Sequence, residues 1–196
     1  MHLESFDFSN NKLEYISPRF FGNTTSLRNI SLANNRLYLM AENNWNDFKK
    51  LFLYLKVLSM IDISNNALKT IPGNMFTRIN TLEYLLLSGN SLTSFSQQWY
   101  IVEIGYLDLR GNLIVSLDSE SMTWLANEVK RTHTDMYVDL QENPFYCSCD
   151  NLNFANWLVQ SNYVITDTPL ICVWKGESLY LNNNSVQVMN DECVHF

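Results

Sequence analysis

The sequence predicts an α/β solenoid, in which short parallel strands stack into one concave sheet and a disulfide-bonded cap closes the C-terminal end. Two observations predict this fold. An apolar pattern with an asparagine at a fixed position occurs six times between residues 3 and 145, and all four cysteines lie in the last 50 residues. We therefore expect a repeat region at 1–143 and a cysteine-rich cap at 144–196.

The repeated pattern is L-x-x-L-x-L-x-x-N-x-L, with other apolar residues at some of the Leu positions. Its copies begin at residues 3, 27, 58, 82, 104 and 135, and Asp135 replaces the first Leu of the last copy. Each copy predicts a short strand whose alternate side chains point inward. In the third copy, Ile61 and Ile63 are expected to point into the core and Asp62 to point outward.

All six copies keep the asparagine. After each strand the chain turns, and the turn exposes backbone groups that no sheet hydrogen bond satisfies. A buried amide side chain can both donate to and accept from such groups. The sequence therefore predicts a ladder of asparagine side chains along the solenoid. Its members are Asn11, Asn35, Asn66, Asn90, Asn112 and Asn143.

Two spacings between copies are 31 residues long, whereas the other three are 22 to 24 residues long. In both long segments, apolar residues recur at intervals typical of a helix. We therefore expect two helices on the convex side, over about 45–55 and 119–131. The apolar positions are Trp45, Phe48, Leu51, Phe52 and Leu55 in the first segment, and Met122, Leu125, Ala126 and Val129 in the second.

The pattern in residues 3 to 145 resembles that of leucine-rich-repeat proteins.

The cysteines that follow it could form disulfides or bind zinc. A C-x-C pair is shorter than the usual zinc knuckle, and no histidine is suitably placed beside the cysteines. We therefore expect two disulfides and an oxidising compartment, either extracellular or the endosomal lumen. Four cysteines permit three pairings. They are Cys147, Cys149, Cys172 and Cys193.

Residues 143–150, with the sequence NPFYCSCD, the later Asn-Trp-Leu at 156–158 and the last two cysteines resemble the cysteine-rich C-terminal cap of extracellular leucine-rich-repeat proteins. The resemblance implies that the first cysteine pairs with the third and the second with the fourth. Because an open solenoid end exposes inward leucines, the cap needs an apolar inner side. Phe154, Trp157 and Leu158 are expected to supply it.

Variable repeat spacing, convex insertions and this cap together resemble the membrane-proximal end of a Toll-like receptor ectodomain. The resemblance implies a pattern-recognition role, ligand-promoted formation of a homodimer or heterodimer, and a transmembrane helix and signalling domain outside this sequence. No cysteine cap precedes Leu3, so further repeats are expected before it. The alternatives are other recognition proteins with such a cap, namely matrix proteoglycans, neuronal adhesion receptors and variable lymphocyte receptors, whose repeats are more uniform, at about 24 residues.

Composition and motifs argue against other functions. Thirteen basic residues against 20 acidic ones give a net charge of −7, so direct nucleic-acid binding is not expected. No apolar run approaches the roughly 20 residues of a membrane helix. Neither G-x-S-x-G, H-E-x-x-H nor a phosphate-binding glycine loop is present. Of the three histidines, only His133 is far from a terminus, and a lone surface histidine is usually solvated. We therefore expect no enzyme, cofactor or bound metal.

Outward strand positions supply a candidate recognition surface. The three stacked tyrosines Tyr84, Tyr106 and Tyr137 offer contact area at low entropic cost. In the neighbouring column, Asp108 and Asp139 lie beside Arg110, which is expected to offset their repulsion. The alternative interpretation is that the aspartates are a regular feature of such strands and that the aromatics pack across them. Three glycosylation sequons begin at Asn23, Asn29 and Asn183; a glycan on Asn29 would obstruct the concave face.

Overall fold

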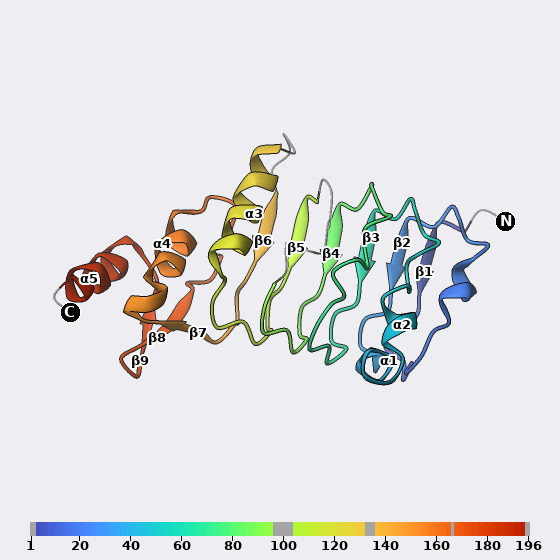
Figure 1. Ribbon diagram of the computed structural model, residues 1–196, viewed down its shortest axis with the longest axis horizontal. Helices are drawn as coiled ribbons and strands as arrows, with labels where there is room; N and C mark the ends of the chain where they lie inside the picture. Colours follow the sequence, from blue (N-terminus) through green and yellow to red (C-terminus); the bar gives the residue numbers. More distant parts are fainter. Residues whose placement is uncertain (1–2, 96–103, 132–135, 166, 195–196) are drawn as a thin grey trace.

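A computed structural model describes residues 3–95, 104–131, 136–165 and 167–194. Six short strands lie side by side along an elongated molecule (Figure 1) and form one parallel sheet in sequence order. The predicted α/β solenoid is confirmed. The strands are β1 (Ser5–Asp7), β2 (Asn29–Ser31), β3 (Met60–Asp62), β4 (Tyr84–Leu86), β5 (Tyr106–Asp108) and β6 (Tyr137–Asp139).

Each strand pairs with the same three positions of the next, so side chains of one kind stack along the sheet. Ile61 and Ile63 are fully buried, whereas Asp62 between them is half-buried, as the alternation predicts. From β2 to β6 the central inward column is completely buried and forms the spine of the core, whereas its β1 member, Phe6, is only partly buried. Its described members after β1 are Ile30, Ile61, Leu85, Leu107 and Val138.

The segments between the strands hold short helices. They are η1 (Pro18–Phe21), α1 (Leu37–Asn43), α2 (Trp45–Phe48) and α3 (Ser119–Arg131). Helix α3 has the bounds expected from the sequence, and its Leu125 is fully buried. In Figure 1, α1 and α2 lie below β2 and β3, and α3 lies beside β6.

The first expected helix is present as α2, but it is shorter than the segment 45–55. Helix α2 ends at Phe48, and the chain continues as tight turns in which Leu51 N–H bonds the Phe48 carbonyl and Leu55 N–H bonds the Phe52 carbonyl. A bond from an N–H group to the carbonyl three residues earlier is the 3₁₀ type, which has three residues per turn. In this conformation the segment buries the same apolar side chains that a helix would bury. Helix α1, which the sequence analysis did not anticipate, precedes them.

The cap combines a second sheet with two helices. Strand β8 (Ile171–Trp174) pairs in parallel with β7 (Phe145–Cys147) and antiparallel with β9 (Glu177–Tyr180). The turn η3 (Cys149–Asn151) leads into α4 (Leu152–Gln160), and α5 (Asn183–Cys193) is the last described helix. Disulfides join Cys147 to Cys172 and Cys149 to Cys193, which is the pairing that the resemblance implies.

The cap closes the free edge of β6. Val138 N–H bonds the Tyr163 carbonyl at 2.8 Å, and the Val138 carbonyl accepts from Ile165 N–H at 2.9 Å. Phe154 and Leu158 of α4 are buried, and the partly buried Trp157 donates from Nε1 to the Tyr163 hydroxyl. At the opposite end, β1 pairs only with β2 among the described residues. Edge pairing and apolar cover therefore end the sheet on the cap side.

Candidate functional site: the outward sheet face and the cap

The asparagine ladder holds the repeats in register. Asn66 is fully buried, and its Nδ2 donates to the carbonyl of Leu32 in the preceding repeat at 2.9 Å and to the carbonyls of Ile63 and Ser64 in its own turn. Its Oδ1 accepts from Leu37 N–H at 3.1 Å. Each repeat is thereby bonded to the one before it through a single side chain.

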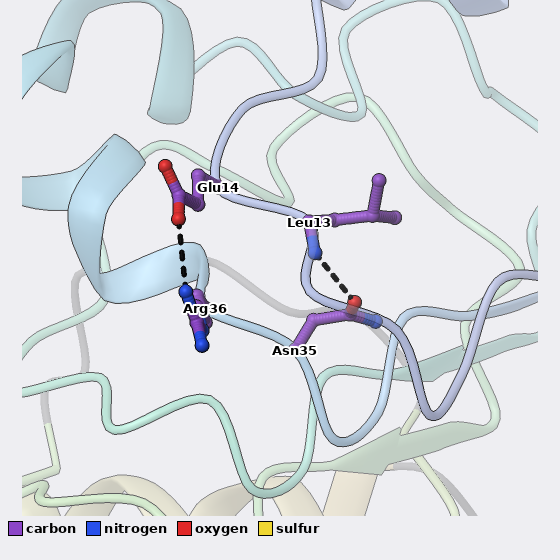
Figure 2. A network of polar contacts seen from close by, with 4 residues as sticks. All are labelled: Leu13, Glu14, Asn35 and Arg36. Atoms are coloured by element: carbon purple, nitrogen blue, oxygen red, sulfur yellow. Dashed lines mark hydrogen bonds and ion pairs between the residues drawn. The ribbon is translucent and has the colours of Figure 1, made fainter.

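Four other asparagines make the same set of hydrogen bonds, with small differences in the bond distances. Figure 2 shows the first step, in which Asn35 Oδ1 accepts from Leu13 N–H at 2.9 Å beside the exposed Glu14–Arg36 ion pair. Asn11 differs, because it is exposed and donates only to carbonyls of its own turn. The asparagine side-chain bonds that join one repeat to the next therefore begin at Asn35. The remaining members are Asn90, Asn112 and Asn143.

The tyrosine column lies on the outward face of β4, β5 and β6. Tyr84 pairs in register with Tyr106, and Tyr106 pairs with Tyr137. The rings of Tyr84 and Tyr106 contact each other, with centroids 6.4 Å apart. Tyr84 is 48% exposed and Tyr137 44%. The column therefore presents aromatic surface to solvent, chiefly from Tyr84 and Tyr137.

The carboxylates of the neighbouring column are less accessible than the sequence suggests. Asp108 is 7% exposed and Asp139 only 4%. Asp108 Oδ1 accepts from Arg110 N–H at 3.0 Å, and Asp139 Oδ1 accepts from Gln141 N–H at 2.9 Å. Asp7 and Asp62 likewise accept from the backbone N–H of the residue two positions later. The aspartates thus fix the turns after β1, β3, β5 and β6. The surface open to a ligand therefore consists of the tyrosines and the exposed Arg110.

Burial and charge shape the titration of this region. Burial raises the pKa of Asp139, and the nearby Asp108 raises it further, whereas the bond from Gln141 N–H and the charge of Arg110 lower it. Burial, followed by the charges of Asp108 and Asp139, raises the pKa of Tyr106. Arg110 therefore offsets part of the negative potential, as its position in the sequence suggests.

The cap also contacts the end of the tyrosine face. With its amide oriented so that both atoms are satisfied, the buried Gln141 donates to Thr168 Oγ1 at 3.2 Å and accepts from the backbone N–H groups of Asp167 and Thr168. The Asp167 charge also raises the pKa of Tyr106. The loop before β8 therefore borders the sheet face beside β6.

The three sequons lie in different surroundings. Asn23 is exposed in a turn after η1, and Asn183 is exposed at the first position of α5. Asn29 lies on β2 between Ser5 and Met60 and is half-buried. Asn29 shares its column with the tyrosines, so a glycan on it would occupy the sheet face.

The outward face of the cap sheet is a feature that the sequence analysis missed. Tyr146 pairs with Val173, and Ile171 pairs with Tyr180, so all four side chains point away from the core. Each is more than a third exposed, and Tyr180 reaches 61%. In a strand, the residues on either side of the buried Cys172 point outward, so this alternation could have predicted the exposure of Ile171 and Val173. Two surface hollows, of about 510 and 660 Å³, share Pro169, Leu170 and Tyr180.

Other site types find no support in the described part of the chain. There, no three His, Cys, Asp or Glu residues gather as a metal site would require. None of the helices that the structure describes has the length and apolarity needed to traverse a bilayer. His2, His133 and His195 lie outside the described residues, as does Asp135.

Comparisons with known proteins agree with this architecture. Family models described as leucine rich repeat match residues 36–92 and 2–24. The chain is 26% identical to Toll-like receptor 5 of Homo sapiens, over 79% of this chain and 17% of that protein. It is 24% identical to trophoblast glycoprotein of Macaca fascicularis, over 88% of this chain and 43% of that protein. The crystal structure of human 5T4, or trophoblast glycoprotein, superposes with a TM-score of 0.66 at 19% identity, over 88% of this chain and 72% of that one.

The repeats, the ladder and the cap define a leucine-rich-repeat domain of the receptor ectodomain type, and such receptor-type families and folds are not enzymes. Within that class, this chain is a repeat segment with a cysteine-bonded cap of the type found in Toll-like receptor ectodomains. It spans 17–20% of the length of the Toll-like receptors of Homo sapiens that it matches. The two disulfides and this similarity fit an extracellular domain.

Proposed function

We propose that this chain is the membrane-proximal part of the ectodomain of an innate immune pattern-recognition receptor, with repeats at 1–143 and a capping domain at 144–196. The observation that carries the proposal is the closed edge of β6, where Val138 pairs with the segment around Val164. A solenoid whose last strand is already paired ends there. We assign this end to the side that faces the membrane by analogy with Toll-like receptors, to which the chain is similar.

Its role in the proposal is to support ligand-promoted dimerisation and signalling. The isolated chain is expected to associate weakly, because each copy carries a net charge of −7 and no ligand contributes binding free energy. Charge repulsion between two acidic copies is reduced by salt. Association should therefore strengthen as the ionic strength rises.

The outward face of the cap sheet is the contact surface that best fits a second copy. Its central residues Tyr146, Ile171 and Val173 are uncharged and are each more than a third exposed. On the same face, Val173 lies opposite Ser178, which is also uncharged. Two acidic chains meet with least repulsion through a neutral apolar face, since the charged side chains then stay at the rim.

Sedimentation at increasing concentration tests this proposal. The wild-type chain should be mostly monomeric, with a dimer that grows at high salt. Val173→Glu should remove that dimer, because it places a charge at the centre of the contact. Tyr84→Ala, on the other sheet, is the matched control and should leave the dimer unchanged.

Two outcomes would contradict the proposal. A tight dimer that is insensitive to salt and to Val173→Glu would exclude the cap face. If Phe8→Ala abolished such a dimer, the contact would instead lie at the open edge of β1, where Phe6 and Phe8 are only partly buried.

The tyrosine face is proposed as the second functional surface, for a protein or microbial ligand. Exposed, stacked tyrosines beside Arg110 suit recognition by apolar contact and hydrogen bonds.

We also propose glycans on Asn23 and Asn29, since disulfide-bonded chains pass through the secretory route. Glycosylation at Asn29 would direct a ligand toward β4, β5 and β6.

A secreted or adhesion-type recognition protein is the alternative, because the chain is also similar, over 88% of its length, to trophoblast glycoprotein, which is not named as a Toll-like receptor. The two functions differ in what accompanies this segment. A transmembrane helix followed by a cytoplasmic signalling domain in the same gene would support the receptor, and a different continuation would support the alternative.

A further inference from the structure

An open apolar hollow lies beside Tyr180 at the end of the cap sheet. Its volume is about 510 Å³, and its walls come from the end of α4, from Pro169 and Leu170, and from residues 180–183. Tyr180 lines the hollow and is 61% exposed, so much of its side chain is available to a ligand. The bond from Leu181 N–H to the Leu170 carbonyl, at 2.8 Å, fixes the two sides of the hollow against each other.

Asn183 lines the same hollow and is the first residue of an Asn-Asn-Ser sequon. The adjacent turn is held by its neighbours, because Asn182 N–H donates to Ser185 Oγ and Ser185 N–H donates to Asn182 Oδ1, both at 2.9 Å. The Asn183 side chain is exposed and makes no hydrogen bond to the residues that the structure describes. Its amide nitrogen is therefore available for a covalent sugar without breaking the cap of α5.

We propose that Asn183 carries an N-linked glycan and that its first N-acetylglucosamine packs against Tyr180 in this hollow. The pyranose ring has one face of C–H groups, which match the electron-rich face of a tyrosine ring. Its hydroxyl and acetamide groups lie at the edges and stay in water at the open mouth. A ligand with one apolar face and polar edges fits a half-open apolar hollow.

The attachment point favours this occupant over an unlinked partner. Asn183 and Tyr180 are only three residues apart, and both line the hollow. A sugar bonded to Asn183 therefore reaches Tyr180 at a high local concentration. The contact would cover Tyr180 and leave Tyr146, at the other edge of the sheet, exposed. This inference goes beyond the proposed receptor function and requires only that the chain be secreted.

The test uses the full chain secreted from eukaryotic cells, trimmed with an endoglycosidase so that one N-acetylglucosamine remains on each modified asparagine. Glycopeptide mapping measures the occupancy of Asn183. NMR then measures the sugar proton shifts, since protons above an aromatic ring move upfield. The variants are Asn183→Gln, Tyr180→Ala and the double variant. Tyr146→Ala, an exposed tyrosine outside the hollow, is the matched control.

We expect Asn183 to be modified and its sugar protons to lie upfield, with the shift lost in Tyr180→Ala and kept in Tyr146→Ala. Asn183→Gln should lower Tm by about 2–4 °C, the size expected for one stacking contact in a chain of this length. In the Tyr180→Ala background the same substitution should have no effect. An unmodified Asn183 overturns the proposal. So does a modified Asn183 whose sugar shifts are the same with and without Tyr180.

Discussion

The side-chain oxygen of Asn66 accepts a hydrogen bond from the backbone N–H of Leu37, which lies 29 residues earlier in the chain. The same side chain donates to the carbonyl of Leu32. One buried amide thus satisfies a donor and an acceptor of the preceding repeat as well as two carbonyls of its own turn. Register between repeats is set by such bonds together with the stacked apolar side chains.

Replacement of Asn66 by Ala should destabilise the chain by about 1–3 kcal/mol, because buried backbone groups of two repeats lose their partners. Asn11→Ala is the control, since Asn11 is exposed and bonds only its own turn, and it should cost much less. Denaturant unfolding of both variants measures the difference. Equal losses would show that the bonds between repeats contribute nothing beyond the local turn.

The repeats were predictable from the sequence because each position has one physical task. Inward leucines need burial, and the turn after each strand needs an amide, so the pattern defines strands, register and ladder together. Residues 49–55 were harder, because a three-residue spacing of apolar side chains suits both a helix and successive tight turns. The burial of Phe48, Leu51 and Phe52 was predictable, but their backbone was not.

The candidate surface was only partly predictable. The register of Tyr84, Tyr106 and Tyr137 follows from the repeat, and the structure shows the same column. The pairing of Val138 with the cap segment around Val164 does not follow from it, because no repeat pattern places that segment. Tyr180 was missed for the same reason, since its exposure depends on how β9 pairs with β8.

Asp139 should make the chain less stable at neutral pH than a neutral side chain would. Its folded pKa is raised above the ordinary value of 3.8 by burial, so the folded state binds the proton more tightly than the unfolded chain does. Stability is therefore lost as the pH rises from 3.8 through the folded value. Asp139→Asn keeps an oxygen that can accept from Gln141 N–H, and it should raise Tm at neutral pH.

The pH dependence of the Tm gain distinguishes the removal of a buried charge from a general change in packing around residue 139. The advantage of Asp139→Asn should shrink in acid, where the wild-type carboxyl is protonated too. Asp62→Asn is the matched control, because Asp62 makes the same turn bond from a half-buried position. Thermal unfolding of both variants over a range of pH measures the effect. A gain for Asp139→Asn that is constant with pH would be inconsistent with this account.

The two disulfides should differ in their response to a reductant. Cys147 and Cys172 are almost completely buried, whereas Cys149 is exposed. A thiolate must reach a sulfur atom to reduce it, so the Cys149–Cys193 bond should open first. Peptide mapping after graded reduction and alkylation follows the order. Simultaneous loss of both bonds in the folded protein would refute it.

Loss of either bridge should also lower stability. The Cys149–Cys193 bridge closes a loop of 44 residues and the Cys147–Cys172 bridge one of 25. On the chain-entropy model, each is worth roughly 3–4 kcal/mol, with the longer loop worth slightly more. Paired Cys→Ser variants compared by denaturant unfolding measure the two contributions. Four free thiols in the secreted protein would remove the basis for an extracellular assignment.

A glycan on Asn29 should shield the sheet face around Met60. The two residues are register partners on β2 and β3, and both are half-buried. Adjacent strands lie about 4.8 Å apart, so the first sugar on Asn29 would overlie the Met60 side chain, while Tyr137, three strands beyond Met60, lies about 14 Å further away. In protein secreted from eukaryotic cells, Asn29→Gln should therefore speed the oxidation of Met60 by peroxide, measured as sulfoxide by mass spectrometry. Asn23→Gln, which removes a sequon in an exposed turn away from the sheet, should not change that rate. If Asn29 is unmodified, or if Met60 oxidises equally fast in both variants, the first repeats are open and a ligand is not confined to the tyrosine face.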